Sequence, residues 1–247
     1  SQSYKDGIRI APISTVTCNF TRPTADAPAL LTMDEVETFF HEFGHAIHGL
    51  VSDVRYKGLK GTPRDFVELP SQVMENWATH PEVLKLYAKH YKTGEVIPDE
   101  LIVKLNNSSL FNKGFIITEL TAAALLDMDY HTLGKVENIE VLDFENNAMR
   151  KRGLIEEIEP RYRSTYFQHI FNGGYAAGYY GYIWSQLLDA DAFAAFVETG
   201  DIFDQETAAR FRKLLEVGGS YDEAETYVKF RGNDPSKEPL MKRAGLL

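Results

Sequence analysis

The sequence predicts a mainly α-helical fold with a small β-sheet near the N-terminus. Residues 33–51 carry apolar side chains at helical spacing, and most segments after residue 64 repeat this pattern between prolines and glycines. Residues 7–20 are instead rich in β-branched side chains and have no helical period. The 247 residues are 44% hydrophobic and 25% charged, which is typical of a globular chain with a sizeable core.

Residues 7–20 are expected to form one or two strands, with Pro12 at a sheet edge or a bulge. An edge strand could accept an extended peptide as an additional strand, and the alternative is a strand that only packs. Pro23 and Pro28 predict a connecting loop over residues 21–31.

The helix over residues 33–51 is predicted from its cap. Thr32 and Glu35 form the pattern of a capping box, so the helix should begin near Met33. An apolar face follows at helical spacing, and we expect it to face the core: Val36, Phe39, Phe40, Phe43, Ile47 and Leu50. A helical wheel places this face nearly opposite three histidines: His41, His45 and His48.

The segment His41-Glu42-Phe43-Gly44-His45 has the H-E-x-x-H pattern. The two histidines lie one turn apart on the same side of the helix, so two imidazole nitrogens can bind one metal ion. Glu42 lies about 100° around the helix and can act on a water molecule at that ion. We therefore expect one zinc ion per chain. The alternative is a structural helical domain with an accidental motif, which would bind no stoichiometric metal.

The third zinc ligand is not settled by spacing. Metzincins supply a third histidine, but here Val51 occupies that position. The ligand should then be a carboxylate from the following helix, with Asp65, Glu68 and Glu75 as candidates.

The rest of the chain is predicted to be helical. Residues 52–64 form a loop, and helices are expected over 64–78, from Pro81 to Gly94, over 98–131 with a break at 106–109, over 139–151, from the segment 172–182 to about 198, and in three shorter C-terminal pieces.

Tyr175, Tyr179 and Tyr182 recur at a spacing of four and three residues, which predicts one helical face. Phenols are good donors to a developing oxyanion, although an aromatic stripe is usually part of the core. Gly173 and Gly174 allow the backbone to bend and another chain, such as a substrate, to approach closely.

The formal net charge of −10 and the absence of a basic stripe argue against nucleic acid as a partner. No apolar run reaches the length of a membrane span, so no membrane partner is expected. The single cysteine, Cys18, is expected to be buried in a strand and fits a cytoplasmic protein, with export of a longer parent left open. The chain starts without methionine, which favours a start inside a longer polypeptide.

Three stretches carry a resemblance to a known family: residues 19–28, 40–48 and 64–72. Together they resemble peptidase family M3, the thimet-oligopeptidase family of zinc peptidases. Three more resemble its bacterial peptidyl-dipeptidase (dipeptidyl carboxypeptidase) branch, at residues 108–114, 123–128 and 161–180. This chain departs from the family at one place: it is two residues shorter at the junction of Thr62 and Pro63.

The resemblance implies a zincin-like catalytic domain over residues 1–247, with an N-terminal helical portion of the same polypeptide as its partner. It implies that Glu68 completes the zinc site, that Asp65 is structural or supports a ligand, and that Tyr179, Tyr182 and His169 contact substrate or stabilise the tetrahedral intermediate. Tyr175 would be a further substrate contact. The implied activity is release of dipeptides from the free C-terminus of oligopeptides. The alternatives are an endo-oligopeptidase and a zinc-binding fragment that is inactive alone.

Two supporting roles follow from chemistry. Glu75 could accept a hydrogen bond from a zinc-bound histidine, and the alternative is a solvated helix residue. A terminal carboxylate needs a cation, for which Arg161, Arg163 and Lys113 are candidates, although a surface charge is the favoured interpretation of each.

Overall fold

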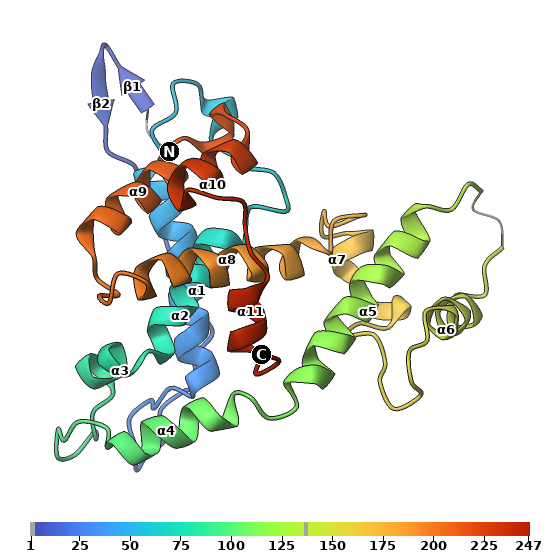
Figure 1. Ribbon diagram of the computed structural model, residues 1–247, viewed down its shortest axis with the longest axis horizontal. Coiled ribbons are helices and arrows are strands. Elements are labelled where there is room, and N and C mark those ends of the chain that lie inside the picture. Colours follow the sequence, from blue (N-terminus) through green and yellow to red (C-terminus); the bar gives the residue numbers. More distant parts are fainter. Residues whose placement is uncertain (1–2, 136–137) are drawn as a thin grey trace.

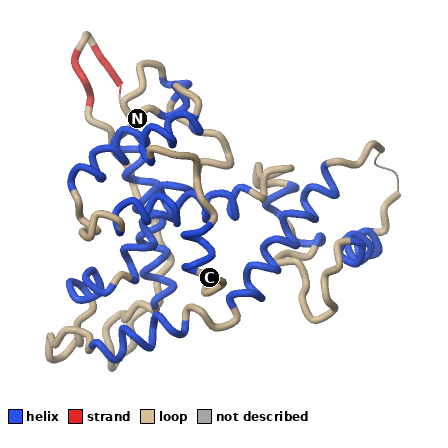
Figure 2. Tube along the Cα trace, viewed as in Figure 1, coloured by secondary structure: helices blue, strands red, loops and turns tan. Residues whose placement is uncertain are grey.

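The computed structural model describes residues 3–135 and 138–247, and helices dominate it (Figures 1 and 2). The helices are α1 Met33–Val51, α2 Leu69–Thr79, α3 Pro81–Tyr87, α4 Asp99–Ser108, α5 Lys113–His131, α6 Val141–Lys151, α7 Gln168–Phe171, α8 Gly181–Val197, α9 Gln205–Glu216, α10 Glu223–Arg231 and α11 Glu238–Arg243. Short 3₁₀ helices lie at Lys57–Leu59, Ser164–Tyr166 and Gly218–Ser220. The prediction of a mainly α fold is therefore confirmed.

The capping box of α1 is formed as predicted. The backbone N–H of Glu35 donates to Thr32 Oγ1 at 3.2 Å, and the N–H of Thr32 donates to Glu35 Oε2 at 2.8 Å. The other oxygen of Glu35 accepts from the N–H of Thr21 at 2.6 Å and from its hydroxyl at 2.7 Å. One carboxylate thus starts the helix and anchors the extended segment that precedes it.

The β-structure is smaller than predicted. β1 (Ser3–Lys5) and β2 (Ile8–Ile10) form an antiparallel hairpin whose turn residues, Asp6 and Gly7, have positive φ values of 52° and 78°. Residues 11–20 form no strand, so the expected strands over 7–20 are wrong beyond Ile10, and this segment provides no edge strand for a peptide. β-branched residues favour a strand only where a partner strand packs beside them. Cys18 is half-buried in this irregular segment and not buried in a strand.

The main helical core lies around α2, which packs between α1 and α8 (Figure 1). Apolar side chains from α2, α8, α9 and α10 fill it: Leu69, Val73, Leu188, Ala192, Ala195, Leu214, Tyr227 and Phe230. Gly44 brings α1 unusually close to α2, because a Cβ atom at this position would lie 2.2 Å from the carbonyl oxygen of Pro70. A side chain of any size would separate the two helices.

The apolar face predicted for α1 is not a core face. Phe39 and Phe43 are each 42% exposed, whereas the buried residues of the helix are Gly44 and Ala46. The close approach to α2 requires small residues, so α1 docks through them and leaves Phe39 and Phe43 at the surface, while Phe40 is half-buried. The hydrophobic periodicity indicated a helix correctly but chose the wrong contact face.

A second group of helices contains α5, α6 and α7, with α4 leading into it (Figure 1). α4 and α5 are separated by residues 109–112, where Asn112 has a φ of 54°, so the break falls slightly later than predicted. In the described part of the chain, no single helix has the length and hydropathy to cross a membrane. α4 and α5 meet both criteria only as a pair bent by 43°.

Candidate functional site

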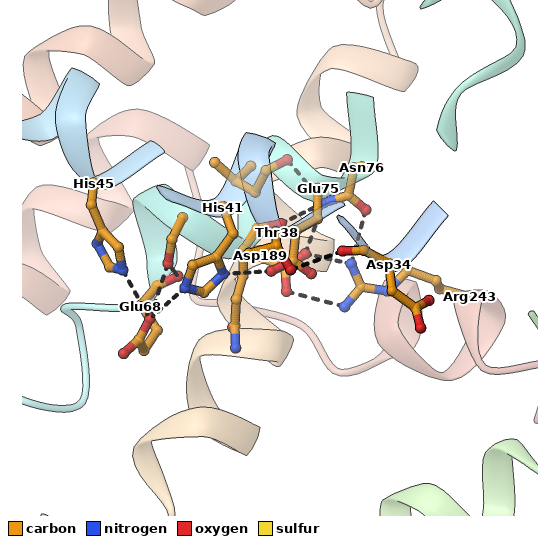
Figure 3. A network of polar contacts seen from close by, with 12 residues as sticks. Asp34, Thr38, His41, His45, Glu68, Glu75, Asn76, Asp189 and Arg243 are labelled. Atoms are coloured by element: carbon orange, nitrogen blue, oxygen red, sulfur yellow. Dashed lines mark hydrogen bonds and ion pairs between the residues drawn. The ribbon is translucent and has the colours of Figure 1, made fainter. Parts of the chain in front are cut away.

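His41 and His45 of α1 meet Glu68 immediately before α2. Glu68 Oε2 lies 3.4 Å from His41 Nε2 and 3.3 Å from His45 Nε2 (Figure 3). Within the described residues these three side chains form the one group whose ligand atoms all lie within 4.8 Å of one another. Four ligands about 2.1 Å from a tetrahedral zinc ion lie about 3.4 Å apart, so the spacing fits this metal. Two histidines and a glutamate are also a ligand set of catalytic zinc sites.

Glu68 is held in place from several sides. It is only 5% exposed, and its Oε2 accepts a hydrogen bond from the hydroxyl of Ser71 at 3.0 Å. Its Oε1 accepts from the hydroxyl of Tyr175 at 2.8 Å. The carboxylate is therefore positioned toward the histidines before any ion binds, which lowers the cost of forming the metal site.

The charges of the cluster support an ionised carboxylate. Burial raises the pKa of Glu68, but hydrogen bonds from His41, His45 and Tyr175 outweigh it and hold the pKa well below its usual range. Burial likewise lowers the pKa of His41, while Glu68 and Glu75 together raise it to about 9.

The second ring nitrogen of His41 has a carboxylate partner. His41 Nδ1 lies 2.6 Å from Glu75 Oε1. The predicted contact between Glu75 and a histidine of the H-E-x-x-H segment is therefore confirmed, and its effect on metal binding stays a prediction. An ionised carboxylate only accepts hydrogen bonds, so Nδ1 donates its proton to Glu75 and Nε2 is the nitrogen that faces Glu68. When His41 is protonated, Nε2 donates to Glu68, and the release of that proton frees Nε2 to bind a metal ion.

A polar network lies beyond Glu75 (Figure 3). The side-chain nitrogen of Asn76 donates to buried Asp189 at 2.9 Å, and its oxygen accepts from Arg243 at 2.8 Å. Arg243 also pairs with Asp189 and donates to the carbonyl oxygen of Gln186 at 3.1 Å. The C-terminal helix α11 is therefore tied to α2 and α8 next to the supporting carboxylate.

The three tyrosines gather near Glu68 but not on one helix. Only Tyr182 lies in α8, whereas Tyr175 and Tyr179 belong to consecutive turns over residues 172–180, which we call the glycine–tyrosine segment. The ring centres of Tyr175 and Tyr182 are 5.2 Å apart, and those of Tyr179 and Tyr182 are 5.1 Å apart. The prediction that the three tyrosines share one helical face is wrong, because the glycines favour turns over a helix at Tyr175 and Tyr179. The turns nevertheless bring the three tyrosine rings together.

The tyrosines differ in what they contact. Tyr175 donates to Glu68, a contact that spacing could not reveal. Tyr179 is only 3% exposed and packs edge-on against Phe167 at 4.8 Å, so the core interpretation describes its ring. Burial raises the pKa of both Tyr179 and Tyr182, which keeps their hydroxyls protonated as hydrogen-bond donors.

His169 lies beside these rings in α7. Its ring centre is 5.7 Å from that of Tyr179 and 6.5 Å from that of Tyr182. Its Nδ1 is buried without a hydrogen-bond partner among the described residues. Gly173 packs tightly against His169, because a Cβ atom would lie 2.8 Å from the Cα atom of His169, and Gly174 has a φ of 81°. The two glycines shape the turn, and their contact with a substrate remains a prediction.

Asp127 is a site residue that the sequence interpretation missed. It is fully buried in α5, and its two oxygens accept from the N–H groups of Ala177 and Tyr179, each at 2.9 Å. His131, one turn later, lies 2.8 Å from the same carboxylate. Ala177 has a φ of 53°, which is strained for a residue with a side chain, so these bonds hold the glycine–tyrosine segment in shape. An aspartate in an apolar helix was the signal that could have found it.

The remaining candidates lie outside the group formed by His41, His45 and Glu68, which we call the metal cluster. Glu42 is half-buried and makes no hydrogen bond or ion pair within the described chain, so its carboxylate is free to react. Asp65 accepts from the hydroxyl of Tyr180 at 3.1 Å, away from the metal ligands. His48 Nε2 is buried without a hydrogen-bond partner among the described residues, which makes His48 a packing residue.

Two of the three cations proposed for a terminal carboxylate are engaged in ion pairs, whereas Lys113, at the start of α5, has no ion-pair partner among the described residues and stays a prediction. Arg161 lies 3.5 Å from Glu119, and Arg163 pairs with Glu145 and Glu159.

Comparisons with known proteins identify a family for this chain. The model of peptidase family M3 matches residues 1–246. Dipeptidyl carboxypeptidase of Escherichia coli (strain K12) is 49% identical over 240 residues, which cover 95% of this chain and 35% of that protein. Probable cytosolic oligopeptidase A of Arabidopsis thaliana is 41% identical over 246 residues, 96% of this chain and 35% of that protein. Oligopeptidase A of Haemophilus influenzae is 38% identical over 249 residues, 98% of this chain and 36% of that protein.

The chain spans about a third of the length of the curated relatives it matches. The family match nevertheless extends over nearly every residue and includes both histidines, Glu42 and Glu68. The chain therefore belongs to peptidase family M3.

Proposed function

We propose that this chain supplies the catalytic site of a zinc peptidase that releases dipeptides from the free C-terminus of oligopeptides. The observation that carries the proposal is the meeting of His41, His45 and Glu68 at the separations that a tetrahedral zinc ion requires. The 49% identity to a protein named dipeptidyl carboxypeptidase supports the choice of reaction.

The residues around the cluster fit hydrolysis of a peptide bond. Zinc, when bound, supplies Lewis acidity toward the scissile carbonyl and acidifies a water molecule. Glu42 takes a proton from the attacking water and later gives it to the leaving amine nitrogen, as general base and then general acid. Its carboxylate has no competing partner in the described chain, which suits this task.

Charge that develops on the carbonyl oxygen needs a hydrogen-bond donor. Tyr182 is proposed for this role, with Tyr179 or His169 as further donors. Tyr182 is half-buried and its ring stacks on that of Tyr175, which contacts Glu68, so it lies beside the cluster. Tyr179 is the weaker candidate because its ring is buried.

Glu42→Gln tests the proposal, because it keeps the shape of the side chain but cannot accept the proton. We expect one zinc ion per chain and a loss of hydrolysis of at least about 100-fold in the longer protein that carries this chain. Asp34→Asn in the first turn of the same helix is the matched control. Retained turnover in Glu42→Gln would overturn the general-base assignment, and absence of bound zinc in the unaltered protein would overturn the metal site.

An endo-oligopeptidase is the second candidate, supported by the 41% identity to an oligopeptidase A. A peptide with a free C-terminus and the same peptide amidated separate the two, because an endopeptidase cleaves both equally. A third outcome is zinc binding without turnover by the 247-residue chain alone. In that case an N-terminal portion of the same polypeptide is needed as a partner. The proposal includes neither nucleic acid nor a membrane as a partner.

A further inference from the structure

Arg64 lies in the turn before α2, close to the metal cluster. Its guanidinium carbon lies 4.6 Å from the ring centre of Tyr175, whose hydroxyl donates to Glu68. The residue is exposed, so its side chain is accessible to a ligand beside the site. One tyrosine side chain therefore separates this cation from a proposed zinc ligand.

Arg64 has no acidic partner within the described residues, where no carboxylate lies within 4.0 Å of its guanidinium. The adjacent carboxylate of Asp65 is bound by the hydroxyl of Tyr180 at 3.1 Å. In a chain with a formal net charge of −10, a cation left free beside the site needs an explanation.

The glycine–tyrosine segment is shaped to hold this arginine. A Cβ atom at Gly174 would lie 3.2 Å from Arg64 Nη2, and one at Gly178 would lie 3.5 Å from Arg64 Cγ. The two glycines thus leave space for the stem and the head of the side chain. The guanidinium is positioned over Tyr175 before a ligand arrives, which reduces the entropy lost on binding.

We propose that Arg64 binds the terminal carboxylate of the peptide substrate. The inference rests on the proposed release of dipeptides, which requires a group that recognises a free C-terminus. A guanidinium offers two parallel N–H donors to a carboxylate, and its attraction to the ring of Tyr175 orients them. Two extended residues beyond the scissile bond span about 7 Å, so the group that binds the terminal carboxylate must lie close to the zinc ligands. Arg64 meets this requirement, because the side chain of Tyr175 contacts both Arg64 and Glu68.

A purely structural role for Arg64 predicts a different result. If Arg64 only held Tyr175 in place, its loss would weaken the binding of every peptide equally. If it binds the carboxylate, its loss affects peptides with a free C-terminus and spares amidated ones. The ratio of the two affinities separates these roles.

The test uses the zinc-loaded Glu42→Gln protein, in which bound peptide is not consumed, and a peptide with a free or an amidated C-terminus. Calorimetry should give at least a 10-fold tighter dissociation constant for the free acid. Arg64→Met should abolish this preference, and Arg64→Lys should retain part of it. Arg55→Met is the matched control, because Arg55 stacks on Tyr56 in an exposed pair away from the site.

An unchanged preference in Arg64→Met, equal weakening of both peptides, or no preference before substitution would each overturn the inference. Turnover of the two peptides by the unaltered protein is measured in parallel. Hydrolysis of neither peptide, by the chain alone or within the longer protein, would overturn the proposed function. If the unaltered protein and Arg64→Met hydrolyse the free acid in preference to the amide by the same factor, the proposed role of Arg64 is overturned and the proposed function is not.

Discussion

His41 Nδ1 lies 2.6 Å from Glu75 Oε1, so a carboxylate on α2 determines which nitrogen of His41 faces the metal cluster. Glu68, which precedes the same helix, contacts the opposite nitrogen at 3.4 Å. Two carboxylates from one segment therefore hold one imidazole from both sides, and the site depends on how α2 is positioned against α1.

Glu75→Ala should weaken zinc binding about 10- to 100-fold, because the imidazole loses the partner that fixes its orientation and its protonated nitrogen. Competition with a chromogenic chelator measures the affinity. Glu82→Ala, an exposed carboxylate in α3, should leave it unchanged. Equal zinc affinity in Glu75→Ala and the unaltered chain would contradict the supporting role of Glu75.

Gly44→Ala should destabilise the chain by about 3 kcal/mol, because the new methyl group would meet the backbone of Pro70 and Ser71 at 2.2 to 2.6 Å. Gly49→Ala on the same helix is the control, since a Cβ atom there meets no atom within 4 Å. It should stabilise α1 by about 1 kcal/mol through helix propensity. Urea unfolding of the metal-free variants measures both, and similar midpoints would show that α1 and α2 are not in close contact.

Asp127→Asn should destabilise the chain by about 3 kcal/mol and disorder the glycine–tyrosine segment. An amide can accept from only one side, so a buried backbone N–H of Ala177 or Tyr179 loses its partner. Asp129→Asn in the same helix breaks an exposed pair with Arg152 and should cost less than about 1 kcal/mol. Thermal unfolding gives the stabilities. The near-ultraviolet circular dichroism of the tyrosines should change only in Asp127→Asn, and identical spectra would contradict the role of Asp127.

His48 should make the stability of the metal-free chain fall as the pH falls. Burial, together with the nearby charges of His45 and Lys60, lowers the pKa of His48 to about 4. The unfolded chain, with an ordinary histidine pKa of about 6.5, takes up a proton first. The contribution is therefore complete above pH 6.5 and is lost progressively down to about pH 4.

At pH 5 the loss due to His48 should be about 2 kcal/mol. Urea unfolding at pH 7.5 and pH 5.0 measures it as the difference between the unaltered chain and His48→Gln, in which the same position cannot titrate. A pH dependence that is identical in both proteins would show that His48 is not buried in its neutral form.

The sequence by itself determined the helix that carries His41 and His45, and it predicted that the two side chains can bind one metal ion. The cap at Thr32, the bounds of α1 and the placement of two histidines on one side of it all depend on contacts within a few turns. Such contacts repeat with the helical period, so they can be read from spacing. Prolines, glycines and periodicity also predicted most of the later helices, but α2 begins at Leu69 and not at residue 64, α3 ends at Tyr87 and not at Gly94, and α7 was not predicted.

Only the tertiary structure decided which distant side chains meet. Spacing left Asp65, Glu68 and Glu75 as equal candidates for the third ligand, and packing of α2 against α1 separated them into three different positions. The bond between Tyr175 and Glu68 joins residues 107 positions apart, and the bonds from Asp127 span 50 and 52 positions. No local period encodes such pairs, because they depend on how whole helices dock. Docking through Gly44 also leaves Phe39 and Phe43 exposed, although periodicity assigned both to the core.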